Sequence, residues 1–201
     1  MTSRDPEVRW QRLMQLLAPI HDGARATARH LARDQMEGDD LFQEALVRAF
    51  EKLHTLRDET RFRAWFYAVL LSLHRTRSRW GFWRRFLPLD PALAKGLEPV
   101  GEDGQKHEEQ QLQAERAARA LASLPAVQRE AIVLHDIDGY SMQEISEMQS
   151  VTISAVKSRV SRGRQQLRRF YERLGLITAS GRTMRTREAR NTVLDTGQSV
   201  L

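Results

Sequence analysis

The 201-residue sequence contains no cysteine. This absence excludes structural disulfides and zinc sites built on thiolates, and it fits a reducing compartment. Uninterrupted aliphatic runs, such as Ala68 to Leu71, are far too short to cross a bilayer. The N-terminus also lacks the apolar segment of a secretory signal peptide. We therefore expect a soluble, cytoplasmic protein with no direct membrane insertion.

Signals for β-strands and for catalysis are missing as well. Alternating runs of β-branched residues do not occur, whereas the good helix formers Leu, Ala, Arg, Gln and Glu dominate. The six histidines are scattered without an HExxH pattern, and the carboxylates fall on predicted solvated faces or beside helix starts. The sequence predicts an all-α protein that is not an enzyme, with no cofactor and no metal site.

Positive charge is in excess. The formal net charge is +6 and the sequence pI is about 10.3. Such a balance favours a polyanionic partner.

The stretch 140–169 predicts two helices separated by a tight turn. Ser141-Met-Gln-Glu144 forms a capping box for a helix that ends near Met148. A polar break follows, and either Ser150 or Thr152 can cap a second helix. Apolar or small residues recur in this second helix at spacings of three and four, which predicts one buried stripe: Ile153, Val156, Val160, Gly163 and Leu167.

The opposite face of the second helix is polar and basic. It carries Ser154, Ser158, Ser161, Arg162 and Gln165, with Lys157, Arg159 and Arg168 on its flanks. An ordinary amphipathic helix usually mixes both charge signs on its solvated face, but residues 157–169 contain no acid. The pattern therefore favours a helix-turn-helix whose recognition helix is the second one over a merely solvated helix.

The N-terminal part predicts a helical domain. Two helices are expected between residues 7 and 35, broken near Pro19 and Asp22-Gly23. Gly38-Asp-Asp40 is expected to cap a third helix that runs to about His54. Its outward face is mixed in charge, a pattern that is usually just solvated.

The segment 61–85 combines aromatic residues with arginines. Aromatic rings beside cations suit single-stranded nucleic acid, because rings stack on bases while cations bind phosphates. Aromatics at helical spacing are more often core residues, and we expect Phe62, Phe66 and Val69 to be buried. Trp65 can fill either role.

Residues 87–111 differ in character. Prolines and glycines interrupt any helix, and six acidic residues oppose two lysines. We interpret this stretch as a flexible acidic linker between two small helical domains, 7–86 and 112–174, the second of which ends in the helix-turn-helix. The first helix of the second domain is expected at Leu112 to Ser123. The tail 175–201 is polar without a sustained stripe, and we expect it to be disordered.

Two pairs of sequence blocks resemble one family. They are DDLFQEALVRAF (39–50) with FRAWFYAVLLSLHRTRSR (62–79), and LPAVQREAIVLHDIDGYSMQEIS (124–146) with VKSRVSRGRQQLR (156–168). In order and separation these blocks are similar to the extracytoplasmic-function (group 4) sigma factors of bacterial RNA polymerase, in the sigma-70 family. The resemblance implies a dissociable promoter-specificity subunit that binds core polymerase and opens promoter DNA.

The resemblance also implies a role for each block. The 39–51 helix is expected to dock on the clamp helices of the polymerase β′ subunit through Asp40, Gln43, Glu44 and Arg48. The 62–85 block is expected to open and capture the −10 element through Trp65, Tyr67, Ser72, Arg75, Thr76, Arg77 and Arg79. The 140–169 block is expected to read the −35 element through Ser154, Lys157, Ser158, Arg159, Ser161, Arg162, Gln165 and Arg168.

Further partners follow from the family. They are the polymerase β subunit, double- and single-stranded promoter DNA, and an anti-sigma factor. The linker is similar to the segment that threads the polymerase near its active-site cleft. This chain carries Ser72 and Thr76 where the family commonly has Asn and Asp, a difference that bears on its −10 base preference.

Two other functions are open to such a sequence. A stand-alone helix-turn-helix regulator would need a dimer interface matched to palindromic half-sites, and no heptad pattern supplies one. An RNA-binding protein or nuclease would need RNA-reading signatures or clustered acids for metal, and the sequence shows neither.

Overall fold

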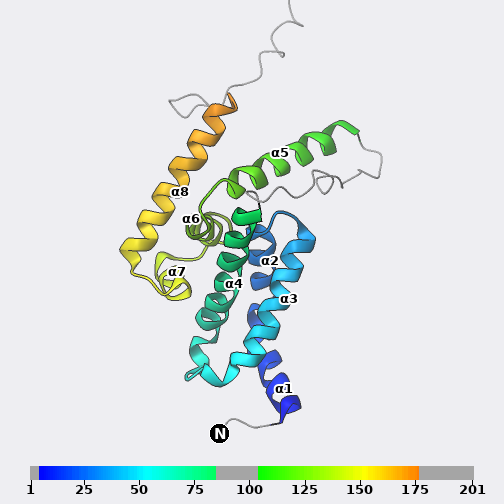
Figure 1. Ribbon diagram of the computed structural model, residues 1–201, viewed down its shortest axis with the longest axis vertical. Helices are drawn as coiled ribbons and strands as arrows, with labels where there is room; N and C mark the ends of the chain where they lie inside the picture. Colours follow the sequence, from blue (N-terminus) through cyan, green and yellow to red (C-terminus); the bar gives the residue numbers. More distant parts are fainter. Residues whose placement is uncertain (1–4, 85–103, 177–201) are drawn as a thin grey trace, which may run out of the picture.

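The computed structural model describes residues 5–84 and 104–176, and helices account for all regular structure within these ranges (Figure 1). The predicted all-α fold is confirmed. Part of the predicted linker and the predicted disordered tail from residue 177 onward lie outside the described residues. Within the described ranges, no helix combines the length and apolar character that a membrane span requires.

Four helices form the N-terminal unit: α1 (Pro6–Leu17), α2 (His21–Leu31), α3 (Gln35–Lys52) and α4 (Phe62–Arg84). Three short 3₁₀ turns connect them at Ala18–Ile20, Leu53–Thr55 and Glu59–Arg61. The predicted break near Pro19 is the first of these turns, but Asp22-Gly23 lies inside α2.

Helix α3 begins earlier than the sequence predicts. Asp34 caps it by accepting a hydrogen bond from the Glu37 backbone N–H at 2.7 Å, so the predicted cap at Gly38-Asp-Asp40 is wrong. Gly38 is buried inside the helix, where an added Cβ would lie 2.5 Å from the Cα of Arg29 on α2. The glycine serves close packing of α2 on α3 instead of ending or starting a helix.

The second unit contains α5 (Gly104–Ala122), α6 (Ala126–Ile132), a π-helical turn (Val133–Ile137), α7 (Met142–Gln149) and α8 (Ile153–Arg173). Helix α5 starts eight residues before the predicted Leu112, within the predicted linker. The π turn ends at Asp138, followed by Gly139 with φ of 78°, a left-handed conformation that glycine adopts without strain.

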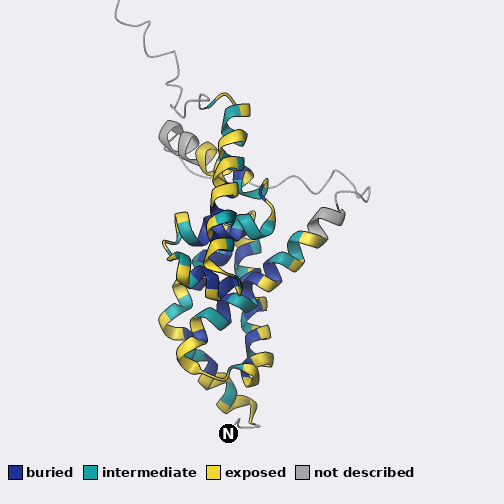
Figure 2. Ribbon diagram, turned by 90° about the vertical axis from the view of Figure 1, so that its left-hand side faces the viewer, coloured by how far each residue is buried: buried dark blue, intermediate teal, exposed yellow. Residues whose placement is uncertain are grey.

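One hydrophobic core runs through both units (Figure 2). Helix α4 packs against α3 on one side and against α6 and α7 on the other, so it belongs to both halves of this core. Phe62 and Phe66 are buried in it as predicted, whereas Trp65 and Val69 are only partly buried at its edge.

Candidate nucleic-acid and polymerase interfaces

The helix-turn-helix forms as its capping residues predict. The Ser141 hydroxyl accepts from the Glu144 backbone N–H at 3.2 Å, and the Glu144 carboxylate accepts from the Ser141 N–H at 3.0 Å. These hydrogen bonds hold the pKa of Glu144 below its usual value. Ser150 adopts a left-handed conformation, with φ of 54°, at the end of α7, and Thr152 caps α8 by accepting from the Ala155 N–H. The turn is therefore made by Ser150 and the cap by Thr152.

Helix α8 is held in place by its small and β-branched residues. Three residues on one face of α8 are buried in the second unit: Val156, Val160 and Gly163. An added Cβ on Gly163 would lie 2.7 Å from Ile132 of α6. Ile153 does not share this burial. It is the first residue of α8 and 39 % exposed, so the predicted buried stripe is wrong at its first residue.

The predicted −35 residues form an exposed basic face, with one exception. Ser154, Lys157, Ser161, Arg162, Gln165 and Arg168 are exposed, and Ser158 is half-buried. Arg159 turns inward instead, and its Nη1 donates to Gln149 Oε1 at 2.6 Å. Burial lowers the pKa of Arg159, and the neighbouring Arg75 cation acts in the same direction.

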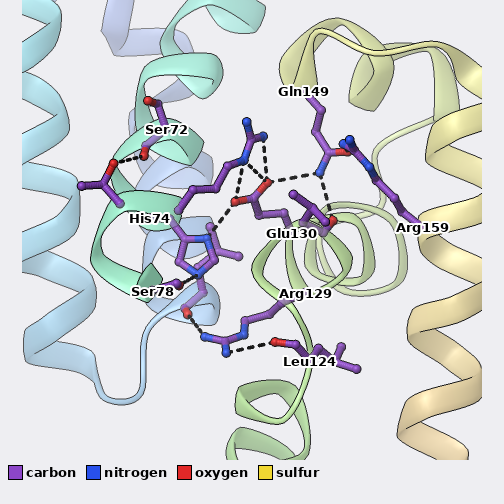
Figure 3. A network of polar contacts seen from close by, with 12 residues as sticks. Ser72, His74, Ser78, Leu124, Arg129, Glu130, Gln149 and Arg159 are labelled. Atoms are coloured by element: carbon purple, nitrogen blue, oxygen red, sulfur yellow. Dashed lines mark hydrogen bonds and ion pairs between the residues drawn. The ribbon is translucent and has the colours of Figure 1, made fainter. Parts of the chain in front are cut away.

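Most of the predicted −10 residues meet at one groove. Ser72, Arg75, Thr76, Arg77 and Arg79 line it together with Arg33 of the α2–α3 connection and Arg129 of α6. Figure 3 shows the α4 and α6 side chains beside it. A groove lined by so many guanidinium groups and hydroxyls suits a sugar–phosphate backbone.

The two predicted aromatic residues of the −10 set do not line this groove. Tyr67 is fully buried, its hydroxyl 2.7 Å from that of Tyr140, and burial raises its pKa. Trp65 is half-buried, and its indole N–H donates to Thr55 Oγ1 at 3.3 Å. In this arrangement Tyr67 cannot stack on a base.

The predicted polymerase-binding residues share one exposed face of α3. Asp40, Gln43, Glu44 and Arg48 are all exposed, and the 59 % exposed Val47 lies among them. Glu44 is paired with Arg77 of α4 at 2.7 Å, and Arg48 with Glu51 at 3.1 Å. The face therefore mixes polar groups with an apolar centre, as protein interfaces commonly do.

Sequence reasoning missed the contacts between the two units. The chief one is Glu130, a fully buried carboxylate of α6 that binds His74 and Arg75 of α4 at 2.9 Å (Figure 3). The available signal was periodicity, since Glu130 sits three residues after Val127 and four before the buried Leu134. A charge on the buried face of an amphipathic helix indicates a specific partner.

Among the described residues, no group of three or more His, Asp and Glu side chains is arranged to hold a metal ion.

Two family profiles match the chain, and each falls on one of the two helical units. The profile described as Sigma-70 region 2 matches residues 17–80, from the last residue of α1 through α2 and α3 into α4. The profile described as Sigma-70, region 4 matches residues 114–167, which span α5 to α8.

Relatives extend over both units. The ECF RNA polymerase sigma factor SigE of Mycolicibacterium smegmatis is 34 % identical over 154 residues, which are 76 % of this chain and 58 % of that relative's length. The ECF RNA polymerase sigma factor EcfG of Rhodopseudomonas palustris is 31 % identical over 143 residues, 71 % of this chain and 76 % of EcfG.

The fold is shared with a solved complex. The sigma factor RpoE of Bartonella quintana, in complex with the anti-sigma factor NepR, superposes with a TM-score of 0.53 at 25 % identity. The match covers 81 % of this chain and 98 % of that structure. With both regions present in order, the chain belongs to the extracytoplasmic-function sigma factors of the sigma-70 family, the alternative promoter-specificity subunits that direct transcription initiation by RNA polymerase.

Proposed function

We propose that this chain acts in the cytoplasm, without catalysis of its own, by joining core RNA polymerase and guiding it to a specific promoter. The observation that carries the proposal is the distribution of surfaces over the two matched regions. One exposed mixed face lies on α3, and one exposed basic face lies on α8. A basic groove lies between the arginines of α4 and residues 122–129 of the second unit. In this proposal residues 7–86 bind polymerase and the −10 element, and residues 112–174 bind the −35 element.

The basic face of α8 is suited to the major groove. Arg162 and Ser158 lie one turn apart, and the helix backbone is fixed from behind by Val156 and Val160. An arginine held in this way can bind the O6 and N7 atoms of guanine bidentately. Lys157 and Arg168 lie to the sides of this pair, where they can contact phosphates.

Simultaneous binding of both elements requires the two units to move apart. The −10 and −35 elements are separated by about 25 base pairs, which is roughly 85 Å of B-DNA. In this structure, by contrast, Arg75 of α4 and Arg159 of α8 are joined through only two intervening side chains. In this proposal the packed arrangement belongs to the free chain, and the units separate on promoter binding.

An anti-sigma factor is a further proposed partner. The similar RpoE was solved in complex with the anti-sigma factor NepR, and the match covers nearly all of that chain. A protein that binds the closed arrangement would hold both DNA-binding surfaces together. Co-expression with the product of an adjacent gene, followed by co-purification, tests this partner.

In vitro transcription tests the main proposal. Purified core polymerase with this chain should initiate at a discrete set of start sites on genomic fragments, and aligning these sites gives the promoter. Gel shifts with and without core polymerase separate the sigma factor from a stand-alone regulator. Specific binding of the free chain to a palindromic site, with no transcription from core, would support the regulator instead.

A further inference from the structure

Among the polar contacts between the two units, one buried carboxylate binds two side chains of α4. Glu130 of α6 has a fully buried side chain and accepts from His74 Nδ1 at 2.9 Å and from Arg75 Nε at 2.9 Å. Both partners belong to α4 in the other unit. We call Glu130 and the four side chains connected to it, His74, Arg75, Gln149 and Arg159, the Glu130 network.

The network continues into the helix-turn-helix (Figure 3). Gln149, at the end of α7, donates to Glu130 Oε2 at 3.4 Å and accepts from Arg159 Nη1 at 2.6 Å. A single chain of hydrogen bonds thus runs from the −10 groove to the recognition helix. It engages one arginine from each of the two predicted DNA-binding sets.

Arg75 is bound by a carboxylate, the group that most resembles a phosphate in its pairing with arginine. A guanidinium pairs with a carboxylate or a phosphate through the same bidentate geometry. Arg75 directs both Nε and Nη2 to Glu130 within 2.9 Å, and one-third of its side chain remains exposed at the groove. Glu130 therefore pairs with the Arg75 guanidinium at the position where a nucleic-acid phosphate would otherwise bind.

Because the carboxylate is buried, its contact with Arg75 is stable only while α4 and α6 remain packed together. A charge removed from water is stable only while its partners stay in place, and removing one partner is costly. Glu130 and the half-buried Arg75 provide this compensation for each other only when α4 and α6 are packed together. Once the units separate, both groups return to water and Arg75 becomes available.

We propose that the Glu130 network is a self-inhibitory contact, in which an internal carboxylate holds the two units closed and withholds Arg75 and Arg159 from promoter DNA. The inhibitory role rests on the proposed function, since it assumes that Arg75 and Arg159 contact promoter DNA once the units have separated. The closed state itself depends only on the contacts. Binding of core polymerase must then supply the free energy that separates α4 from α6.

Neutral substitutions test the network on the free chain. Because the chain has no cysteine, Lys52→Cys on α3 and Arg173→Cys on α8, both exposed, provide two unique labelling sites for distance measurement by electron spin resonance. In Glu130→Gln the distance distribution should shift to longer values, with the open-to-closed ratio raised about tenfold. Glu59→Gln is the matched control, because its Arg12 partner lies within the same unit.

Arg75→Gln probes the same contact from the other unit. It leaves the charges of α6 to α8 intact, so it decides the question if Glu130→Gln loses helix content by circular dichroism. We expect the same lengthening. Wild-type distances in a folded Glu130→Gln, or in Arg75→Gln when Glu130→Gln unfolds, overturn the proposal.

Binding of core polymerase tests the inhibition. If the free chain must open first, its apparent Kd is raised by the reciprocal of the open fraction, so Glu130→Gln should bind core up to about tenfold more tightly than wild type. Unchanged affinity despite a longer distance shows that the network does not inhibit. A wild-type chain that fails to bind core contradicts the proposed function alone, because the distance measurement does not involve polymerase.

Discussion

The hydroxyl oxygens of Tyr67 and Tyr140 lie 2.7 Å apart, and their rings meet edge to face with centroids separated by 5.5 Å. Tyr67 belongs to α4 and Tyr140 directly precedes the cap of α7, so the pair joins the two helical units. Thr27 of α2 lies 3.3 Å from the Tyr67 oxygen and provides a second partner. Burial raises the pKa of Tyr67, and its hydroxyl therefore stays neutral and can bond to both neighbours.

Tyr140→Phe should remove this cross-unit hydrogen bond while keeping the ring packing. We expect the free energy of unfolding to fall by about 1 kcal/mol, the usual net value of such a bond. Urea denaturation followed by circular dichroism measures it, with Tyr171→Phe on α8 as the matched control. An unchanged midpoint would show that the Tyr67 hydroxyl is satisfied by Thr27 alone.

Gly163→Ala should destabilise the helix-turn-helix even though alanine is the better helix former. The new Cβ would lie 2.7 Å from Ile132 Cγ1, and such overpacking costs about 1–3 kcal/mol, more than the roughly 1 kcal/mol gained in helix propensity. Thermal denaturation should show a lower midpoint. Ser161→Ala, exposed on the same helix, should leave it unchanged or raise it. A higher midpoint for Gly163→Ala would mean that α6 moves away at little cost.

Asp39 should make the fold sensitive to acid. Hydrogen bonds from Arg29 and Arg25 hold its pKa well below the ordinary value of 3.8. A lowered folded-state pKa stabilises the protein above the unfolded-state pKa, and this contribution is lost as the pH falls below about 4. Urea denaturation between pH 6 and pH 2 should therefore show a shallower acid dependence in Asp39→Asn. Asp40→Asn is the adjacent control, and equal slopes for both variants and wild type would remove Asp39 as the cause.

Gln43→Ala should weaken binding to core polymerase without affecting the fold. Gln43 is exposed on the mixed face of α3, and truncating an interface residue that contributes to binding costs about 1 kcal/mol or more, which is roughly fivefold in Kd. Glu44→Ala is less informative, because Glu44 also binds Arg77 of α4. Fluorescence titration with core compares Gln43→Ala with Gln143→Ala, an exposed glutamine on α7. Wild-type affinity for Gln43→Ala at normal thermal stability would contradict the assignment of this face.

Arg162→Ala and Arg168→Ala should have different effects on promoter choice. A base contact by Arg162 contributes about 1–3 kcal/mol of discrimination, so its loss should relax preference at one −35 position. A phosphate contact by Arg168 carries no sequence information, so its loss should weaken all promoters alike and reduce the salt dependence. Transcription from a library randomised across the −35 element measures both. If Arg162→Ala lowers every promoter by one common factor, Arg162 contacts phosphate instead.

The local structure of this chain was predictable where one signal acted alone. The Ser141-Glu144 capping box and the Thr152 cap form hydrogen bonds between residues three apart, so local sequence is enough to specify them. The start of α3 was not predictable in the same way. Gly38 looks like a helix boundary by propensity, but its lack of a side chain is used for contact with Arg29, which only the packed structure reveals.

Some residues of the candidate surfaces could be predicted from the sequence, and others could not. The exposed residues of α3 and α8 followed from helical periodicity, because a residue opposite the buried stripe faces outward in any packing. Tyr67 and Arg159 did not follow, since each turns toward a neighbouring element that the periodicity of its own helix cannot specify.

The sequence by itself determined the helical class, the caps of α7 and α8, the basic face of α8 and the family, because these depend on short-range spacing and on residue type. Only the tertiary structure decided how α4 meets α6 and α7, and hence that Glu130 of one unit neutralises Arg75 of the other. The physical reason is that these side chains lie 55 residues apart, and a buried charge selects its partner by geometry across the packed interface instead of by position along the chain.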